Sequence, residues 1–336
     1  MIKTRSPWFW VPTLYFAQGI PYFIVNNISV MMFTKMGVPN GDMALFTSLL
    51  YLPWFIKPFW SPFVDIIKTK RWWTISMQIL MSIAFILLTL TIPTPSAEML
   101  ASQSTPISMF TVTLLLFTIT AFTSATHDIA ADGFYMLALP QNEQAAFVGI
   151  RSTFYRLASI FGQGILVTIA GAIELSSQDI PFSWRITMLV TAIMFSATTL
   201  YHTFIIPRSD NDRSVLGTEK ASPKAIFREF ARSFTTYFKK PGVVLAITFM
   251  LLYRLPEAFL LKLCMPFLVA SKEMGGLALS TAEVGIVYGT IGVIFLTLGG
   301  ILGGIFASRL GLKRSLWVMA ACMTLPCLTF VYLAID

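Results

Sequence analysis

Residues 60–73 read WSPFVDIIKTKRWW, and residues 303–314 read GGIFASRLGLKR. In both stretches an apolar run ends in a polar turn with a basic cluster, and a new apolar run follows at once. The first stretch connects the second and third apolar runs of the chain, and the other connects the eighth and ninth. The shared pattern predicts a repeat in which each half places the same basic turn between its second and third helix.

The apolar runs are long enough to cross a bilayer. Hydrophobic residues make up 56% of the 336 residues and charged residues only 12%, whereas soluble domains have about 45–50% and about 25%. A spanning helix needs about 20 mostly apolar residues. The sequence therefore predicts an all-α polytopic membrane protein with about nine transmembrane helices, at 8–33, 43–66, 72–93, 107–132, 145–173, 184–206, 242–270, 282–307 and 315–335.

The basic residues are distributed unevenly among the connections. Lys and Arg gather at residues 3–5, 68–71, 207–241 and 309–314, and the opposite connections carry little beyond Lys35, Arg185 and Lys272. Because cytoplasmic loops are enriched in Lys and Arg, the N-terminus and the 207–241 stretch are predicted to be cytoplasmic. The same bias explains the net charge of +8. Nucleic-acid binding is not expected, because the basic residues lie between apolar runs and not on one folded face.

The 207–241 stretch divides the chain into domains. It contains Phe227, Phe230, Phe234 and Phe238 at helical spacing among basic residues, which predicts an amphipathic helix at the membrane surface that tethers two bundles or binds a partner. The expected domains are a six-helix N-terminal bundle (1–206), a basic cytoplasmic linker (207–241) and the first three helices of a second bundle (242–336). If both halves have six helices, about 90 further residues are expected in the native transporter.

These stretches resemble a known family. The sequence GGIFASRLGLKR is similar to the loop signature of the major facilitator superfamily. Three stretches resemble its muropeptide permease (AmpG-like) and acetyl-CoA transporter branch: residues 57–65 (KPFWSPFVD), 126–135 (THDIAADGFY) and 155–157 (YRL). His127 stands where that branch usually has Gln. The resemblance implies two six-helix bundles, the second incomplete here, and an inner-membrane permease that imports anhydro-muropeptides with protons for cell-wall recycling.

The repeat and the resemblance together assign a conformational loop motif. Its members are Lys57, Asp65 and Arg71 in the first half and Gly304, Arg309, Gly311, Lys313 and Arg314 in the second.

Two carboxylates inside the fourth span are candidates for proton coupling or gating. Asp128 and Asp132 are four residues apart and share one helix face, and Arg151 and Arg156 follow on the next helix. The four form either a salt-bridge cluster that closes the cytoplasmic end or a site where a carboxylate takes up and releases a proton. Asp128 is the first candidate because it lies deeper. His127, about 100° around the helix, is either a further titrating group or a hydrogen-bonding helix residue.

The seventh predicted span adds three ionisable residues. Glu257 is a further coupling candidate and can pair with Arg254 at i, i+3. Arg156, Arg254 and Lys262 are either unpaired cations that bind an anionic substrate or partners of helices that the sequence does not identify.

Three side-chain amides lie around Gly19–Pro21, which is expected to interrupt the first helix. Gln18, Asn26 and Asn27 are suited to hydrogen bonding with a sugar or peptide, and contacts between helices are the equal alternative.

These observations predict a secondary active transporter, a symporter that works by alternating access. No nucleotide-binding, nucleophile or metal-ligand motif is present in the sequence, so neither enzymatic activity nor a cofactor is expected. A facilitator for another anionic or polar solute, such as acetyl-CoA, a sugar or a drug, is one alternative. A non-transporting membrane sensor or scaffold is another. The expected partners are a small anionic glycopeptide-like substrate, protons and the lipid bilayer, and a monomer is expected.

Overall fold

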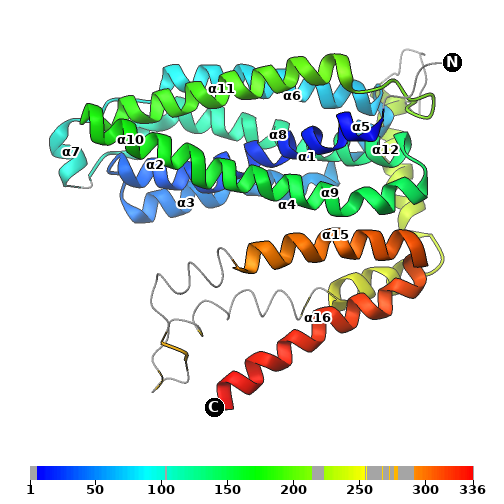
Figure 1. The fold of residues 1–336 in the computed structure, drawn as a ribbon. Coiled ribbons are helices and arrows are strands. Elements are labelled where there is room, and N and C mark those ends of the chain that lie inside the picture. Colours follow the sequence, from blue (N-terminus) through cyan, green and yellow to red (C-terminus); the bar gives the residue numbers. More distant parts are fainter. Residues whose placement is uncertain are drawn as a thin grey trace. The chain divides into compact units, whose positions relative to one another are not determined.

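The computed structural model describes residues 6–102, 104–213, 223–253 and 291–335, together with residues 255, 267, 272 and 276–278. Every regular element in these ranges is a helix (Figure 1). The chain divides into two compact units, which are Met1–Gln144 with Arg151–Phe230 and Ala145–Ile150 with Ala231–Asp336.

The first predicted span is helical from end to end. After the short helix η1 (Pro7–Phe9) it consists of α1 (Val11–Phe23), the π-helix η2 (Ile24–Ile28) and α2 (Ser29–Lys35). The prediction of an interruption at Gly19–Pro21 is wrong, because α1 continues through both residues. A proline inside a helix removes one backbone hydrogen bond, and here the helix widens into a π turn just after Pro21, a form of irregularity often found at functional sites.

The second predicted span is divided by its prolines, as the sequence indicates. It consists of α3 (Asn40–Leu50), α4 (Leu52–Ile56), η3 (Lys57–Phe59) and α5 (Ser61–Ile66). Pro53, Pro58 and Pro62 each lie in the first two positions of one of the last three pieces. Proline is tolerated there because the first N–H groups of a helix have no partner within it.

Four further spans complete the first unit. They consist of α6 (Lys70–Thr91), η4 (Ile107–Phe110) with α8 (Thr111–Ala138), α9 (Gln141–Ser159) with the π-helix η5 (Ile160–Leu166) and α10 (Val167–Ser177), and α11 (Ile180–Ile205). The short helix α7 (Ala97–Ala101) lies between α6 and η4.

Five helices in the described part are long and apolar enough to cross a membrane. They are Lys70–Thr91, Ile107–Ala138, Gln141–Ser177, Ile180–Ile205 and Lys313–Leu333, and Val243–Tyr253 and Ile294–Leu310 are shorter apolar helices. The predicted spans 8–33 and 43–66 are not among the five. The first has three side-chain amides within its apolar run, and the second is divided by its prolines.

The first unit has a core made by neighbouring helices. Helix α6 packs against α8 and α11, and α1 packs against α8 (Figure 1). The rings of Phe85 and Phe195 meet edge to face between α6 and α11, with centroids 5.3 Å apart. The outer faces are apolar too: Leu90 on α6 and Phe204 on α11 are 75% and 69% exposed. Large exposed apolar surfaces of this kind are expected where a helix contacts lipid.

The second unit contains the other copy of the basic turn, between α15 (Gly292–Leu310) and α16 (Leu312–Ile335). Gly311 adopts a positive φ of 77° there, and its N–H donates to the Ala307 carbonyl. In the first unit Lys68, between α5 and α6, adopts a φ of 63°. A positive φ is readily adopted by glycine and uncommon for lysine. The two turns therefore each contain a residue with positive φ. In the second turn this residue is a glycine, which adopts the conformation more readily than the lysine of the first turn.

A further helix, α12 (Pro223–Phe238), lies in the basic stretch where the phenylalanine spacing predicts one. Phe230 on this helix stacks on Phe63 of α5, with ring centroids 4.7 Å apart.

Candidate functional site

An ion pair inside the first unit joins the break in the second span to α8. The Lys57 Nζ lies 3.7 Å from the Asp128 Oδ2, and Asp128 as a whole residue is only 7% exposed. Lys57 begins η3, the short turn that the prolines place between α4 and α5. The Asp128 Oδ1 is buried without a hydrogen-bond partner among the described residues. Among the described residues, this buried carboxylate therefore faces the Lys57 ammonium with one oxygen, and its other oxygen has no hydrogen-bond partner.

The second carboxylate of α8, one turn further on, has two partners on one of its oxygens. The Asp132 Oδ1 lies 2.5 Å from an Arg151 Nη2 and accepts a 2.8 Å hydrogen bond from the Tyr15 hydroxyl. The Arg151 guanidinium also lies over two rings, 4.2 Å from the centroid of Tyr15 and 4.3 Å from that of Tyr135. Cation–π contacts and a charge-assisted hydrogen bond both favour the ionised pair. Asp132 and Arg151 thus neutralise each other at the end of the bundle.

The turn from α8 to α9 holds Arg151 in this position. The Tyr135 hydroxyl donates a hydrogen bond to the Gln144 carbonyl. The Gln144 side-chain amide donates in turn to the carbonyls of Met136 and Leu139, at 2.9 and 2.7 Å. These bonds satisfy carbonyls at the C-terminal end of α8 that have no partner within the helix. They tie the start of α9 to the end of α8, and so align Arg151 with Asp132.

Aromatic side chains form a wall beside Asp128. The ring centroid of Tyr22 lies 5.2 Å from that of Trp54 and 6.2 Å from those of Tyr51 and Tyr155. Tyr22 and Tyr155 lie close enough to Asp128 to interact with its carboxylate electrostatically. The Trp54 Nε1 is buried without a hydrogen-bond partner among the described residues. Rings with polar edges offer apolar contact and hydrogen bonds together, as ligand sites commonly do.

Close packing of α1 on α9 assembles this wall. A Cβ added at Gly19 would lie 2.7 Å from the Ala158 Cβ and 3.1 Å from the Tyr155 carbonyl oxygen. No real Cβ fits at such distances, so only glycine allows this approach. Gly19 thereby brings the α1 side chain Tyr22 against Tyr155 on α9.

The predicted amides on the first span behave differently from one another. Gln18 is 7% exposed and lies against the Asp128 carboxylate, and its Oε1 has no hydrogen-bond partner in the described ranges. Asn26 donates to the Tyr22 carbonyl within its own helix, at 3.0 Å. Asn27 is exposed and donates to the Gln163 Oε1 at 3.3 Å, which joins the π-helices η2 and η5. Asn27 therefore contacts another helix, whereas Gln18 belongs to the ionic site.

The predicted substrate cations are only partly within the described residues. Arg156 on α9 is half-buried, and its Nη1 is buried without a hydrogen-bond partner among residues that the structure describes. Arg254, Glu257 and Lys262 lie outside the described residues.

His127 faces a different part of the bundle from its neighbour Asp128. Its Nε2 lies 2.9 Å from the Gln78 Nε2, the Gln78 Oε1 lies 3.0 Å from the His202 Nδ1, and the His202 Nε2 lies 3.0 Å from the Thr13 hydroxyl. An amide nitrogen only donates and an amide oxygen only accepts. The His127 Nε2 must therefore accept and the His202 Nδ1 must donate. Both histidines of the chain are fully buried, and the His127 Nδ1 has no hydrogen-bond partner among the described residues.

The loop-motif residues do not act as one cluster. Asp65 forms an ion pair with the buried Lys70. Arg71 donates to the carbonyls of Ile206 and Thr203, at 3.0 and 2.8 Å, and so caps the end of α11. Lys57, which the sequence groups with this motif, lies at the break in the second span and pairs with Asp128.

In the second unit Gly304 lies in α15, and Gly311 makes the turn after it. Arg309, Lys313 and Arg314 are exposed around that turn, and none of them forms an ion pair with a described residue.

Sequence reasoning missed several members of the site. It identified neither the pairing of Lys57 with Asp128 nor the aromatic wall, and it did not connect Gln78 and His202 with His127. The tyrosines within predicted spans and the prolines on both sides of Lys57 were visible signals. In the described part of the chain, no three His, Cys, Asp or Glu side chains gather as metal ligands would.

A family comparison covers nearly the whole chain. The Major Facilitator Superfamily profile matches residues 13–336. The chain belongs to the Major Facilitator Superfamily. This confirms the resemblance seen in the loop signature, and with it an all-α, multi-pass transporter fold.

Named relatives of this superfamily member point to one branch. The chain is 26% identical over 329 residues to "Putative transporter AmpG 4" of Rickettsia conorii, covering 94% of this chain and 71% of that protein. It is 25% identical over 311 residues to "Anhydromuropeptide permease" of Escherichia coli K12, covering 90% of this chain and 56% of that protein. The chain thus spans little more than half the length of the Escherichia coli permease. The branch expected from residues 57–65 and 126–135 agrees with these names.

Proposed function

We propose that this transporter takes up anhydro-muropeptides together with protons by alternating access. The single observation that carries the proposal is the Asp128 carboxylate, which is buried, faces Lys57 and has one oxygen without a hydrogen-bond partner in the described part of the chain. The names of the relatives support the substrate class.

The geometry suggests how proton and substrate binding are coupled. While Asp128 is ionised, Lys57 is its counter-ion. When Asp128 takes up a proton, Lys57 is left without a partner charge, and a substrate carboxylate can replace the Asp128 carboxylate beside it. A buried charge needs a counter-charge, so the exchange links proton uptake to binding of an anionic solute.

The surrounding side chains suit a glycopeptide. Arg156 has a buried nitrogen without a partner in the described part and can accept a second anionic group. Tyr22, Tyr51 and Tyr155 offer ring faces and hydroxyls to sugar rings. Gln18 offers a free amide oxygen to a peptide N–H or a sugar hydroxyl.

The remaining parts of the proposal follow from the sequence. The 1–206 segment is the N-terminal bundle, 207–241 the linker and 242–336 part of the second bundle. The N-terminus and linker face the cytoplasm of a cell whose inner membrane holds the protein. The protein works as a monomer without enzymatic activity.

Uptake into proteoliposomes tests the proposal. We expect radiolabelled anhydro-muropeptide to accumulate when a pH gradient is applied, and Asp128→Asn to abolish the effect of the gradient. Asp210→Asn, an exposed carboxylate in the basic loop, is the matched control and should transport normally. Undiminished, gradient-dependent uptake by Asp128→Asn would refute the coupling role.

The same vesicles separate the alternatives. Competition by acetyl-CoA, a sugar or a drug, with no effect of muropeptide, would identify another solute. Absence of uptake and of binding for every solute would favour a sensor or scaffold.

A further inference from the structure

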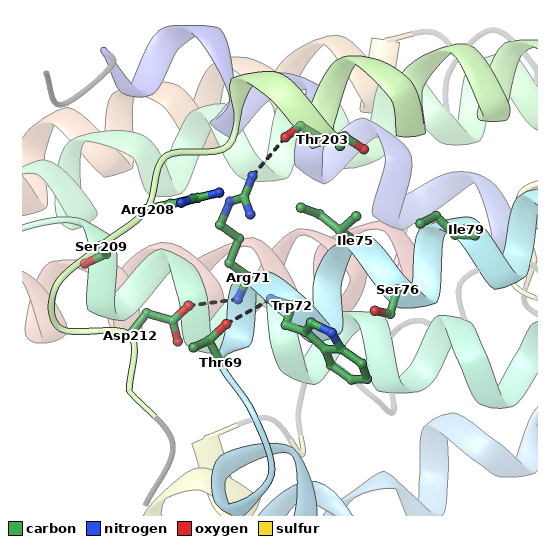
Figure 2. Close-up of a pocket in the computed structure, with 10 residues that line it drawn as sticks. All are labelled: Thr69, Arg71, Trp72, Ile75, Ser76, Ile79, Thr203, Arg208, Ser209 and Asp212. Carbon is green, nitrogen blue, oxygen red and sulfur yellow. Dashed lines mark hydrogen bonds between the residues drawn. The ribbon is translucent and has the colours of Figure 1, made fainter. Parts of the chain in front are cut away.

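A groove on the outside of the first unit is separate from the ionic site. It has a volume of about 510 Å³ and lies where α6 begins, α11 ends and residues 208–212 pass between them (Figure 2). Its lining consists of Thr69, Arg71, Trp72, Ile75, Ser76, Ile79, Thr203, Arg208, Ser209 and Asp212. All of these residues belong to the first unit.

One end of the groove is positively charged. Figure 2 shows Arg208 beside Arg71, and the two guanidinium groups are close enough to repel each other. The ion pairs among the described residues involve other cations, so neither arginine is paired with a carboxylate there. The carboxylate of Asp212 is already engaged, because its two oxygens accept hydrogen bonds from the backbone N–H groups of Lys70 and Arg71, at 2.7 and 2.9 Å. Arg208 is thus available to an anion, and the Arg71 guanidinium beside it adds positive charge although it already donates to two carbonyls and lies near the Asp212 carboxylate.

The position of Arg71 is fixed by the fold. Its side chain donates to two carbonyls at the end of α11, and its backbone N–H is held by Asp212. Arg208 is exposed on the loop that follows. The hydroxyls of Thr69 and Ser209 line the same end. This end therefore offers guanidinium and hydroxyl donors together, a combination that suits a phosphate oxygen.

The other end of the groove is apolar. Trp72, Ile75 and Ile79 follow each other at i, i+3 and i+7 on one face of α6, and Trp72 and Ile79 are each 46% exposed. Helix α6 is one of the candidate membrane spans, so this face continues into the hydrocarbon layer. Tryptophan is enriched where a span leaves that layer. The groove thus runs from an apolar wall at membrane depth to a cationic end at the interface.

We propose that this groove binds one anionic phospholipid of the adjacent leaflet. The lipid phosphate lies between Arg71 and Arg208, and one acyl chain lies along Ile75 and Ile79. Basic pockets beside spans bind anionic headgroups through this combination of charge and apolar contact. A soluble phosphate compound would use only the cationic end, because nothing in it would cover the apolar wall.

A matched pair of charge variants tests the cationic end. The delipidated full chain in a neutral detergent is titrated with short-chain phosphatidylglycerol, and binding is followed by the rise in unfolding temperature. Arg208→Gln should weaken binding about fivefold, because a Lys or Arg at an anionic membrane surface contributes about 1 kcal/mol. Arg213→Gln removes the same charge from the same loop but does not line the groove, and it should bind like the wild type. Equal affinity of the two variants overturns the proposal.

Two further arms test the lipid chain. Ser76→Phe places a ring inside the groove and should abolish phosphatidylglycerol binding, whereas Ile83→Phe, further along α6 and outside the groove, should not. Phosphatidylcholine of the same chain length should bind more weakly than phosphatidylglycerol. Glycerol 3-phosphate that binds as tightly as phosphatidylglycerol would assign the site to a soluble phosphate compound and overturn the lipid proposal, as would unchanged lipid binding by Ser76→Phe.

Discussion

His127 and Asp128 are neighbours on α8, yet they belong to two different polar clusters. His127 faces α6 and α11, where Gln78 lies between the two histidine rings and is hydrogen-bonded to both. Asp128 faces α1 and the break in the second span, where Lys57 is its ion-pair partner and one of its oxygens has no hydrogen-bond partner that the structure describes. Consecutive side chains on a helix point about 100° apart, so one step along the chain separates a packed interior from an ionic site.

The difference teaches how polar side chains are divided between stability and function. Buried groups whose hydrogen bonds are satisfied hold helices in place. A buried charge with an incomplete set of partners can exchange them. The bonds from Gln78 to both histidines link α6, α8 and α11 even though the His127 Nδ1 has no partner among the described residues. The Asp128 cluster, which contains the ion pair, is the one assigned to the proposed transport.

The largest expected effect comes from changing the two neighbours in turn. Asp128→Asn should reduce gradient-driven uptake to the level of empty liposomes, because an amide cannot exchange a proton with the site. His127→Gln should retain most of the uptake, because a glutamine can still accept the bond from Gln78. Initial uptake rates with and without a pH gradient measure both. Loss of gradient dependence in His127→Gln, in which Asp128 is intact, would contradict the assignment of proton coupling to Asp128 and not to His127.

The second effect concerns the histidine cluster. Gln78→Leu leaves a ring nitrogen of each histidine buried without its partner, which should lower the free energy of unfolding by about 2–4 kcal/mol. Ser82→Ala removes the 3.0 Å bond to the Thr199 hydroxyl on the same helix pair and the 2.8 Å bond to the Gln78 carbonyl within α6. It leaves both histidine bonds in place and should cost about 1 kcal/mol. Thermal unfolding in detergent compares the stability losses of the two variants. A Gln78→Leu protein as stable as Ser82→Ala would show that the cluster does not hold the helices.

The third effect concerns the engaged carboxylate. Arg151→Gln removes the ion pair with Asp132 and both ring contacts, with an expected loss of about 1.5–3 kcal/mol. Arg151→Lys keeps the charge but loses the planar stacking on Tyr15 and Tyr135, and its stability should lie between that of Arg151→Gln and the wild type. Unfolding temperatures rank the three proteins by stability. If Arg151→Lys is no more stable than Arg151→Gln, the stability that Arg151 contributes comes from stacking on the rings alone.

The fourth effect concerns helix approach on the ionic side. Gly19→Ala introduces a Cβ that meets the Ala158 Cβ at 2.7 Å, and overpacking of this kind costs about 1–3 kcal/mol. Ala158→Gly in the same chain should recover part of the loss, because it removes the atom that clashes. A double-mutant cycle on unfolding free energy measures the coupling, and strict additivity would contradict the close approach.

The smallest effect is expected at Lys57. Its side chain is 35% exposed and its nitrogen is 3.7 Å from the carboxylate, so Lys57→Gln should change stability by less than about 1 kcal/mol. Uptake of the anionic substrate should nevertheless fall, because the proposed counter-ion is lost. Stability and uptake measured on the same preparation distinguish a role in substrate binding from a role in folding. A large loss of stability with normal uptake would show that Lys57 stabilises the fold and does not bind the substrate.

The sequence predicted those parts of the site that depend on neighbouring residues. The four-residue spacing of Asp128 and Asp132 predicted that they share one helix face. The short turn after α8 predicted that Arg151 lies near them. The partner of Asp128 could not be predicted, because Lys57 lies on a separate span. For the same reason, the partners of His127 on α6 and α11 were not found. Gly19 and Pro21 gave the wrong prediction of a helix interruption. A helix can continue through both residues, because α9 packs closely on Gly19 and a π-helix follows Pro21.

Hydropathy and the basic connections indicated from sequence alone that the chain is an all-α membrane protein, and the resemblance of GGIFASRLGLKR to a loop signature indicated the Major Facilitator Superfamily. These signals are local: apolar length sets a span, and glycine, proline and charge set its ends. Only the tertiary structure decided which way each helix faces, and hence that His127 and Asp128 belong to different clusters. Helix rotation depends on contacts between segments far apart in sequence, such as Gly19 with Ala158 and Gln78 with His202.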